Sequence, residues 1–284
     1  RARRAQAEDV DDVLGGGEAV LRCRRVRPLL DIGCGDFDGQ TAGAADEVVM
    51  VTGGLAGPIE VLPLRRGAHA PGGALQERMV CRYETETYAH FIATDPTNRY
   101  AFVPHVESAN AIYQFDFDQS TGQLTANEHT PILACGAGEG PRHLVFHPTM
   151  DLVYADNEQG SSVTVYRFDS GQGTLVAVQT VSTLPAEGCE GNSNAQIHIH
   201  PSGKSLYVSN RGHDSIAMFA IDAETGLLSS LGQQPGEEVP RAFAIDPNGD
   251  FLYSGADASN FLRTFRVGED GRLEPQGASF DLGG

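Results

Sequence analysis

Four segments of the chain repeat one pattern of short β-type runs, and each copy can be aligned on a proline. The four prolines, Pro96, Pro148, Pro201 and Pro247, lie 52, 53 and 46 residues apart, which is the period of a four-stranded propeller blade rather than of a helical solenoid. Each copy has three runs rich in β-branched and aromatic residues, then a fourth run that opens with Gly-x-Leu. Because a lone blade cannot bury its own faces, the repeat predicts an all-β propeller.

The amino-terminal part of the chain fits the repeat poorly. Residues 46–80 look like an altered blade, in which EVVMVTGG and PIEVLPL are the second and third strands and RRGAHAPGGAL is the following turn. Residues 1–45 match nothing in the repeat and stay unassigned. We therefore expect the propeller domain to cover residues 46–284, with repeats clearest from residue 88. Four to five blades are few for a closed ring, so we expect a chain that is incomplete at its N-terminus.

One glycine-rich segment suggests a different fold. Arg27 to Gly39, RPLLDIGCGDFDG, resembles the tight turn of nucleotide-binding methyltransferases. That chemistry needs a helix after the turn and an acidic residue at the end of a second strand, about 20 residues later. The following QTAGAADEVVMVTGG is too short for the helix, so we reject this interpretation.

Charge and cysteine content exclude several classes of partner. The formal net charge is −18, and from residue 88 onward 9 basic residues face 24 acidic ones. Nucleic acids and anionic membranes need a basic surface, so neither is an expected partner. No apolar run is long enough to span a membrane. The 5 cysteines are scattered without metal-ligand spacing, which favours reduced thiols in a cytoplasmic protein and no zinc.

Two positions of the repeat carry most of the candidate site residues. Six residues before the proline stand His90, Arg142, Ala195 and Arg241, and ten residues after it stand Val106, Glu158, Arg211 and Asp257. Antiparallel pairing of the first two strands brings these positions to the same end of each blade. If the first strand is innermost, they form a polar basin at one mouth of the central channel.

The basin suits a small anion, because the acidic chain places three of its nine later basic residues there. The adjoining His105, Asn157 and Asn210 and the neighbouring His143 extend it. A purely structural alternative is that a pair such as Arg142 and Glu158 only connects blades.

The copies HFIATDPTNRYAFVPH, GEGPRHLVFHPTMDLVYADNEQGSSVTVYRFD, HPSGKSLYVSNRGHDSIAMFAID and VPRAFAIDPNGDFLYSGA resemble the seven-bladed propeller lactonase family. This family includes bacterial 6-phosphogluconolactonases and fungal 3-carboxy-cis,cis-muconate lactonising enzymes. The resemblance implies a seven-bladed propeller with His90, Arg142, Glu158 and Arg211 as active-site residues. Gln196 departs from the family, whose members commonly carry an acid there, and this difference alters the expected charge of the basin.

The resemblance also implies a hydrolase of carbohydrate metabolism that opens a sugar-acid lactone, with 6-phosphogluconolactone of the pentose phosphate pathway as the expected substrate. Glu158 or His90 would transfer protons, while Arg142 and Arg211 bind the substrate's anionic group and the oxyanion. We expect Asn157, Asn210, Arg241 and His143 to bind the rest of the substrate.

No cofactor or metal is expected, and the sequence leaves the oligomeric state open. Two alternatives remain. One is a carboxymuconate lactonising cycloisomerase that uses the same groups, and the other is a non-catalytic propeller that serves as a binding platform.

Overall fold

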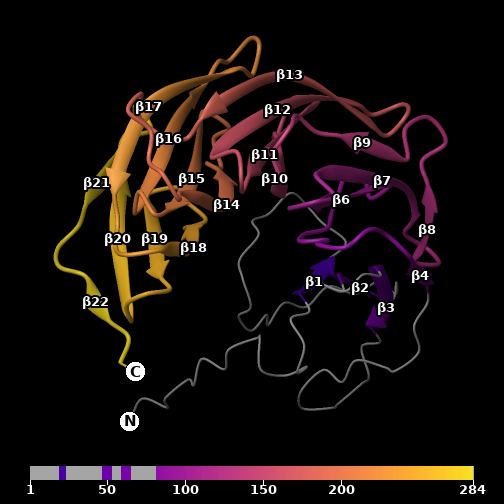
Figure 1. Ribbon diagram of the computed structural model, residues 1–284, viewed down its shortest axis with the longest axis horizontal. Helices are drawn as coiled ribbons and strands as arrows, with labels where there is room; N and C mark the ends of the chain where they lie inside the picture. The colour runs from indigo at the N-terminus through magenta and orange to yellow at the C-terminus, as the bar shows by residue number, and fades with distance from the viewer. Residues whose placement is uncertain (1–18, 24–46, 53–58, 65–80, 284) are drawn as a thin grey trace.

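Antiparallel β-strands make up all the regular secondary structure in the part of the chain that the computed structural model describes, which is residues 19–23, 47–52, 59–64 and 81–283, with side chains from residue 83. The strands form five sheets, which we name blades A to E in chain order (Figure 1). No helix that could cross a membrane occurs in these ranges.

The strand bounds follow the chain. Blade A contains β1 (Ala19–Cys23), β2 (Glu47–Thr52), β3 (Ile59–Leu64) and β4 (Cys81–Tyr83). Blade B contains β5 (Ala93–Thr94), β6 (Tyr100–His105), β7 (Ala111–Asp118), β8 (Gln123–Ala126) and β9 (Ile132–Ala134). Blade C contains β10 (Pro141–Phe146), β11 (Leu152–Asn157), β12 (Ser162–Asp169) and β13 (Thr174–Ser182). Blade D contains β14 (Ser193–Ile199), β15 (Ser205–Arg211), β16 (Ser215–Ile221) and β17 (Leu228–Pro235). Blade E contains β18 (Pro240–Ile245), β19 (Phe251–Ala256), β20 (Phe261–Val267), β21 (Leu273–Pro275) and β22 (Phe280–Asp281).

The strand order confirms the predicted all-β blades. In every sheet the first four strands pair in chain order, while β9 pairs with β7 and β22 with β20. The two apolar runs of the altered blade are its second and third strands, β2 and β3, as predicted. β1 lies within residues 1–45, which the repeat left unassigned, and pairs with β2. The methyltransferase-like Arg27–Gly39 and the predicted RRGAHAPGGAL turn lie outside the described residues.

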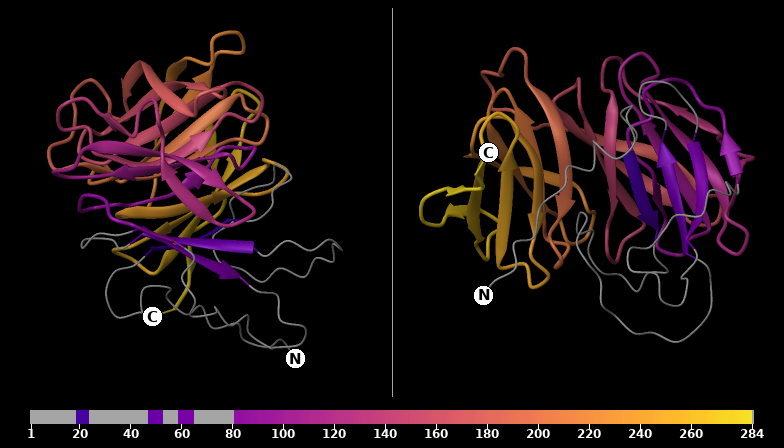
Figure 2. Two further views of the ribbon diagram at one scale, coloured as in Figure 1. Left: turned by 90° about the vertical axis from the view of Figure 1, so that its right-hand side faces the viewer. Right: turned by 90° about the horizontal axis from the view of Figure 1, so that it is seen from below.

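The described blades follow one another round an arc, with their first strands toward its centre (Figure 1). β10 and β14 lie against each other, and β14 lies against β18. Viewed from below, the blades stand as upright layers whose faces turn toward one another (Figure 2). The first strands of neighbouring blades therefore lie close to one another near the centre of the arc.

Three of the four hydrophobic clusters in the described residues lie between blades, and the fourth is built from blade B with Tyr83 of blade A packed against it. Tyr154 and Val165 of blade C pack with Leu206 and Phe219 of blade D in one cluster. A second cluster joins blades B and C, and a third joins blades D and E. This arrangement is the physical reason why the repeat predicts a ring of blades: each face is buried only by its neighbour.

A hydrogen bond from a second-strand tyrosine ties each of three blades to the next. The hydroxyls of Tyr100, Tyr154 and Tyr207 donate to the backbone carbonyls of Gly171, Gly226 and Gly271 at 3.0, 2.9 and 2.9 Å. Gly226 and Gly271 are the glycines of the Gly-x-Leu pattern, with φ values of 69° and 81°. Added Cβ atoms there would overlap with side chains of the preceding blade, so the pattern marks a close contact between blades.

Candidate active site

A β-bulge interrupts the first strand of three blades at its channel end. The pairing register shifts between Pro141 and Leu144 in blade C, between Asn194 and Ile197 in blade D, and between Pro240 and Ala242 in blade E. A bulge bends its strand and re-aims the local side chains, which is why bulges are common beside active sites. The first candidate position of the repeat falls within each of these bulges.

A left-handed residue precedes the candidate position in three blades. Tyr88, Gly140 and Val239 have φ values of 65°, 62° and 54°, and each stands two residues before His90, Arg142 or Arg241. Their carbonyls accept the backbone N–H of Val106, Glu158 and Asp257 at 3.1, 2.7 and 2.9 Å. Backbone hydrogen bonds therefore join the two repeat positions at one end of the blade, as the alignment predicts.

Glu158 connects arginines from two blades. Its Oε2 accepts Nε–H of Arg142 at 2.9 Å, and its Oε1 accepts Nη2–H of Arg211 at 2.8 Å. Arg142 also donates through Nη1 to the carbonyl of Ala195, and Arg211 donates to the carbonyl of Asn194 at 2.7 Å. Only 4% of Arg142 is exposed, so these bonds hold a desolvated guanidinium in one orientation.

Two neutral histidines flank this triad. The rings of His90 and His143 meet edge to face with centroids 5.2 Å apart, and Phe91 packs on His143 at 4.8 Å. Burial first, and then the positive charges of Arg142, Arg211 and Arg241, lower the pKa of His90 to about 3. The same causes hold the pKa of His143 well below its usual value. Neither imidazole is protonated near neutral pH.

Two buried nitrogen atoms in this cluster have no hydrogen-bond partner among the described residues. They are Nδ1 of His90 and Nε of Arg211. Buried polar groups are normally satisfied, so an unpaired donor and an unpaired ring nitrogen in one cluster indicate room for a polar ligand.

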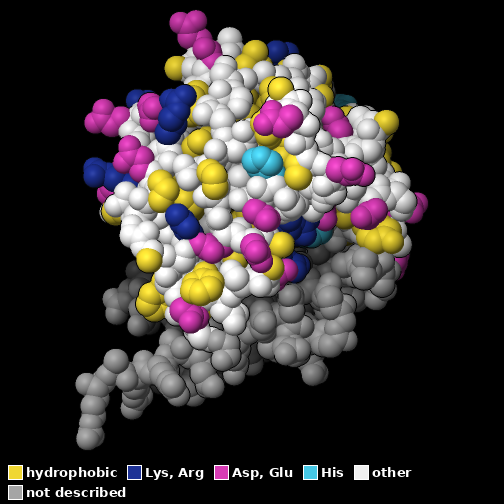
Figure 3. Space-filling view, turned by 60° about the vertical axis from the view of Figure 1, so that its left-hand side comes forward, with side chains coloured by type: hydrophobic (Ala, Val, Ile, Leu, Met, Phe, Trp, Pro, Cys, Tyr) yellow, Lys and Arg dark blue, Asp and Glu magenta, His cyan; other side chains and the backbone are white. Residues whose placement is uncertain are grey.

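Arg241 occupies a more open place at the edge of the basin. It forms an ion pair with Asp257 at 3.5 Å, and about half of each side chain is exposed, 50% and 55%. Figure 3 shows one face of the molecule, on which acidic side chains outnumber basic ones. The basin gathers three arginines on this mainly acidic protein, and they are paired with the carboxylates of Glu158 and Asp257.

Comparison with known proteins identifies the family. The profile described as "Lactonase, 7-bladed beta-propeller" matches residues 57–284. The chain belongs to this propeller lactonase family. This match, together with the antiparallel sheets, confirms the expected fold class and the family resemblance of the repeated segments.

Curated members of the lactonase family are similar over part of their length. A 6-phosphogluconolactonase of Pectobacterium carotovorum is 35% identical over 187 residues, which is 66% of this chain and 55% of that protein. A 6-phosphogluconolactonase of Yersinia enterocolitica is 33% identical over 178 residues, covering 63% and 53%. The chain spans about half the length of the curated relatives that it matches.

Solved structures show the same architecture. The periplasmic gluconolactonase of Pseudomonas aeruginosa is 25% identical with a TM-score of 0.72, covering 84% of this chain and 68% of that one. A protein from Lactobacillus plantarum is 26% identical with a TM-score of 0.72, covering 81% and 67%.

The structure of this lactonase-family chain brings five expected residues together: His90, Arg142, His143, Glu158 and Arg211. It places the two asparagines differently. The amide of Asn157 donates to Ser162 and Thr164 at 2.9 Å each, and the amide of Asn210 donates to the carbonyl of Thr183 at 3.1 Å. Both are fully buried within their blades, so their position does not support the expected contact with substrate.

The expected change of charge at Gln196 has a local structural explanation. The Gln196 amide nitrogen lies 2.8 Å from Nε2 of His198, and its oxygen accepts the backbone N–H of Phe243 at 3.0 Å. Gln196 therefore joins blade D to blade E through neutral hydrogen bonds.

The sequence did not predict two features of the site, the backbone carbonyls that bind the arginines and the buried carboxyl group of Asp156. The carbonyls of Asn194 and Ala195 accept bonds from the arginines, although Ala195 looked uninformative. Asp156 lies directly before Asn157 and Glu158 and has no exposed surface. An acidic residue inside a strand is the signal that could have revealed it, since Pro104, Ser209 and Gly255 take this place in the other copies.

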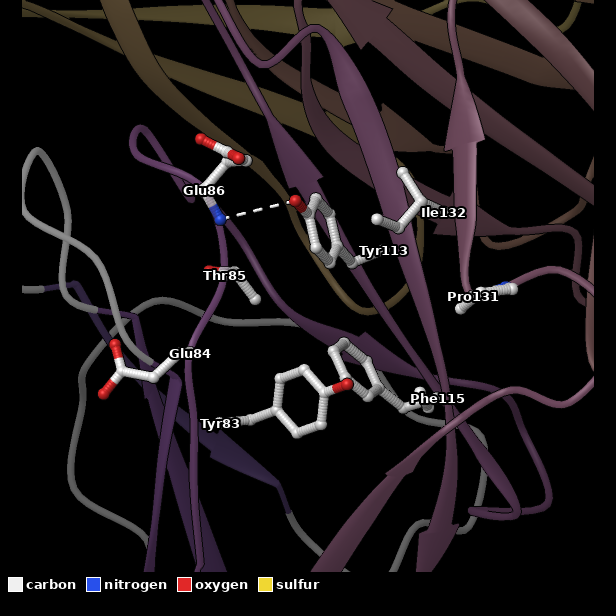
Figure 4. A pocket seen from close by; sticks show the side chains of 9 residues that line it. Tyr83, Glu84, Thr85, Glu86, Tyr113, Phe115, Pro131 and Ile132 are labelled. Carbon is white, nitrogen blue, oxygen red and sulfur yellow. Dashed lines mark hydrogen bonds between the residues drawn. The ribbon is translucent and has the colours of Figure 1, made fainter.

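A second hollow lies near the start of blade B, away from the arginines (Figure 4). Tyr83, Tyr113 and Phe115 line it, and the Tyr113 hydroxyl accepts the backbone N–H of Glu86 at 3.3 Å. Its charged lining residues are acidic, so it does not suit an anionic substrate. Among the side chains described from residue 83 onward, no group of three or more His, Cys, Asp or Glu could hold a metal ion.

Proposed function

We propose that the protein hydrolyses the lactone of a phosphorylated sugar acid, with 6-phosphogluconolactone as substrate and 6-phosphogluconate as product. The observation that carries the proposal is the Arg142–Glu158–Arg211 triad beside His90, with two buried nitrogen atoms left unpaired. The names of the curated relatives support this choice of substrate.

The two arginines would bind negative charge at two stages of the reaction. Arg211 has a free Nε–H beside the bond that its Nη2 makes to Glu158, which suits a phosphate or carboxylate oxygen. Arg142 is fixed by Glu158 and Ala195 and would stabilise the oxyanion that forms when water attacks the lactone carbonyl. Arg241, at the open edge, would contact the distal part of the substrate.

Glu158 is the better candidate for proton transfer. A general acid or base works best when its pKa lies near the working pH, whereas the pKa of His90 is about 3. Glu158 would take a proton from the attacking water and deliver one to the ring oxygen as the C–O bond breaks. Neutral His90 would hydrogen-bond substrate or water through its unpaired Nδ1, and His143 would support its ring.

A hydrolysis assay tests the proposal directly. Arg142→Ala should lower kcat/KM for 6-phosphogluconolactone by about 100-fold or more, the usual effect of losing one oxyanion donor. Spontaneous opening of the lactone must be subtracted. Arg272→Ala is the matched control, because Arg272 is half exposed and, within the described residues, its ion pair is with Asp270 in the turn before β21. Equal rates for the wild type and Arg142→Ala would reject the assignment.

Two further elements belong to the proposal. A preparation that closes carboxymuconate but opens no lactone would favour the cycloisomerase alternative.

We also propose a cytoplasmic location, since Cys135 and Cys189, the two cysteines with described side chains, are free thiols. Cell fractionation tests this location.

A further inference from the structure

Asp156 is a buried carboxyl group to which the proposed chemistry gives no role. It lies on β11 with no exposed surface. Its Oδ1 accepts the backbone N–H of His143 at 2.9 Å, while its Oδ2 has no partner. Burying a carboxyl group with an unsatisfied oxygen is costly, so the site must gain something from its presence.

The bond from Asp156 closes the β-bulge that carries Arg142 and His143. In blade D, Ser209 occupies the same place and accepts the backbone N–H of Gln196 at 3.1 Å. In blade E the same place holds Gly255, which has no side chain for this bond. The bulge residue Arg241 is half exposed there, whereas Arg142 is buried and held by three partners. The bulge residue is therefore fixed in blade C, where the second strand supplies a side-chain acceptor, and is more open in blade E, where it supplies none.

Asp156 also supplies negative charge to Arg142 from inside the protein. Arg142 on β10 is the opposite charge that acts most strongly on it, and Glu158 acts on it as a like charge. Neutral His143 binds Asp156 through its backbone N–H, and His198 is the titratable residue on the facing strand β14. When substrate competes for the arginines, or Glu158 takes up a proton, Asp156 still holds its charge near Arg142.

We propose that Asp156 is a positioning residue, whose carboxylate fixes the bulge that aims Arg142 and His143 into the basin and balances the charge of Arg142. This inference rests on the proposed function for its kinetic effect, but its structural part stands alone. Burial raises the pKa of Asp156 to about 6, with Arg142 opposing the rise. The carboxylate is therefore ionised above about pH 6 and neutral below it.

The test compares Asp156→Asn with the wild type in lactone hydrolysis from pH 5 to pH 8. Wild-type kcat/KM should fall below about pH 6, as Asp156 takes up its proton. Asp156→Asn should lose about tenfold or more at pH 8 and show no inflection near pH 6. The matched control is Asp222→Asn, which makes the same charge change in an exposed turn and should stay within about twofold with a wild-type profile. Wild-type rates and inflection in Asp156→Asn would overturn the proposal.

A spectroscopic measurement keeps the proposal testable if Asp156→Asn fails to fold or no lactone is opened. The ring signals of His143, assigned by their loss in His143→Gln, should shift with a midpoint near pH 6 in the wild type, although His143 itself stays neutral. They should stay constant in Asp156→Ser, which copies the acceptor of blade D without its charge. A wild-type protein without lactonase activity but with this titration rejects the proposed function alone. Constant His143 signals in the wild type reject the role of Asp156.

Discussion

His90 owes its neutrality to several neighbours acting together. It is largely buried, and three arginines from three different blades lower its pKa. A proton on this ring would repel the same arginines that bind the substrate. The cluster therefore keeps the imidazole in the form that can accept a hydrogen bond.

The low pKa of His90 has a consequence for stability. In the unfolded chain its pKa is 6.5, so between pH 6.5 and about 3 the unfolded state binds a proton that the folded state does not. Stability is fully present above pH 6.5 and is lost as the pH falls through this window. His90→Gln should therefore show a weaker decrease in melting temperature between pH 7.5 and pH 4.5 than the wild type. Asp156 acts with the opposite sign between pH 3.8 and 6 but in both proteins, so the difference isolates His90. Parallel curves would contradict the pKa shift.

The sequence predicts the charged members of the site better than the amide ones. Alignment on the prolines brings Arg142 and Glu158 together, because backbone pairing determines which ends of strands meet. It brings Asn157 to the same end of the blade, but a one-residue step along a strand turns a side chain to the opposite face, and the Asn157 amide bonds within its own blade. The role of Asp156 is not predicted, because its partner is a backbone N–H in a bulge and the residue pattern does not indicate where bulges occur.

At the scale of the element, the left-handed residues that precede the candidate position in three blades differ in how well they tolerate this conformation. Both Gly140 and Val239 precede a proline, but Gly140 adopts positive φ without steric cost, whereas Val239 is β-branched. The conformation is kept because the Val239 carbonyl binds the backbone N–H of Asp257. Backbone strain is thus localised beside the basin in blade E.

Val239→Gly should relieve this strain. We expect the free energy of unfolding to rise by about 1 kcal/mol, the typical cost of a left-handed non-glycine residue. Val239→Ala keeps a Cβ and should gain less. Gly140→Ala, at the same place in blade C, should instead destabilise the protein, because its φ is positive and its Cβ would overlap with Gln159. Urea denaturation measures all three variants, and a less stable Val239→Gly would refute the argument.

At the scale of the whole molecule, cohesion between blades depends on the apolar clusters and the tyrosine bonds described above. The repeat predicts this arrangement well, because each blade lacks a core of its own. The repeat does not predict that a tyrosine of one blade binds the carbonyl of a glycine turn in the next blade. The bonded residues are 71, 72 and 64 positions apart in the chain.

Removing one of these bonds should loosen the contact between two blades. Tyr154→Phe leaves the Gly226 carbonyl buried without its donor, and should lower the free energy of unfolding by about 1–2 kcal/mol. Tyr253→Phe is the matched control, since Tyr253 holds the same repeat position in blade E, is 37% exposed and makes no such bond within the described residues. Its effect should stay within about 0.5 kcal/mol. Equal losses in both variants would show that the bond contributes nothing specific.

Four of the blades place one side chain each at the same repeat position beside the basin, and this position also takes part in contacts between blades, because Arg142 of blade C donates to the Ala195 carbonyl of blade D. His90, Arg142 and Arg241 occupy this repeat position in three blades, and the small residue Ala195 occupies it in the fourth. Ala195 is fully buried and its carbonyl accepts a bond from Arg142, so a larger side chain at this position would need space that the packed site does not offer and would displace that arginine.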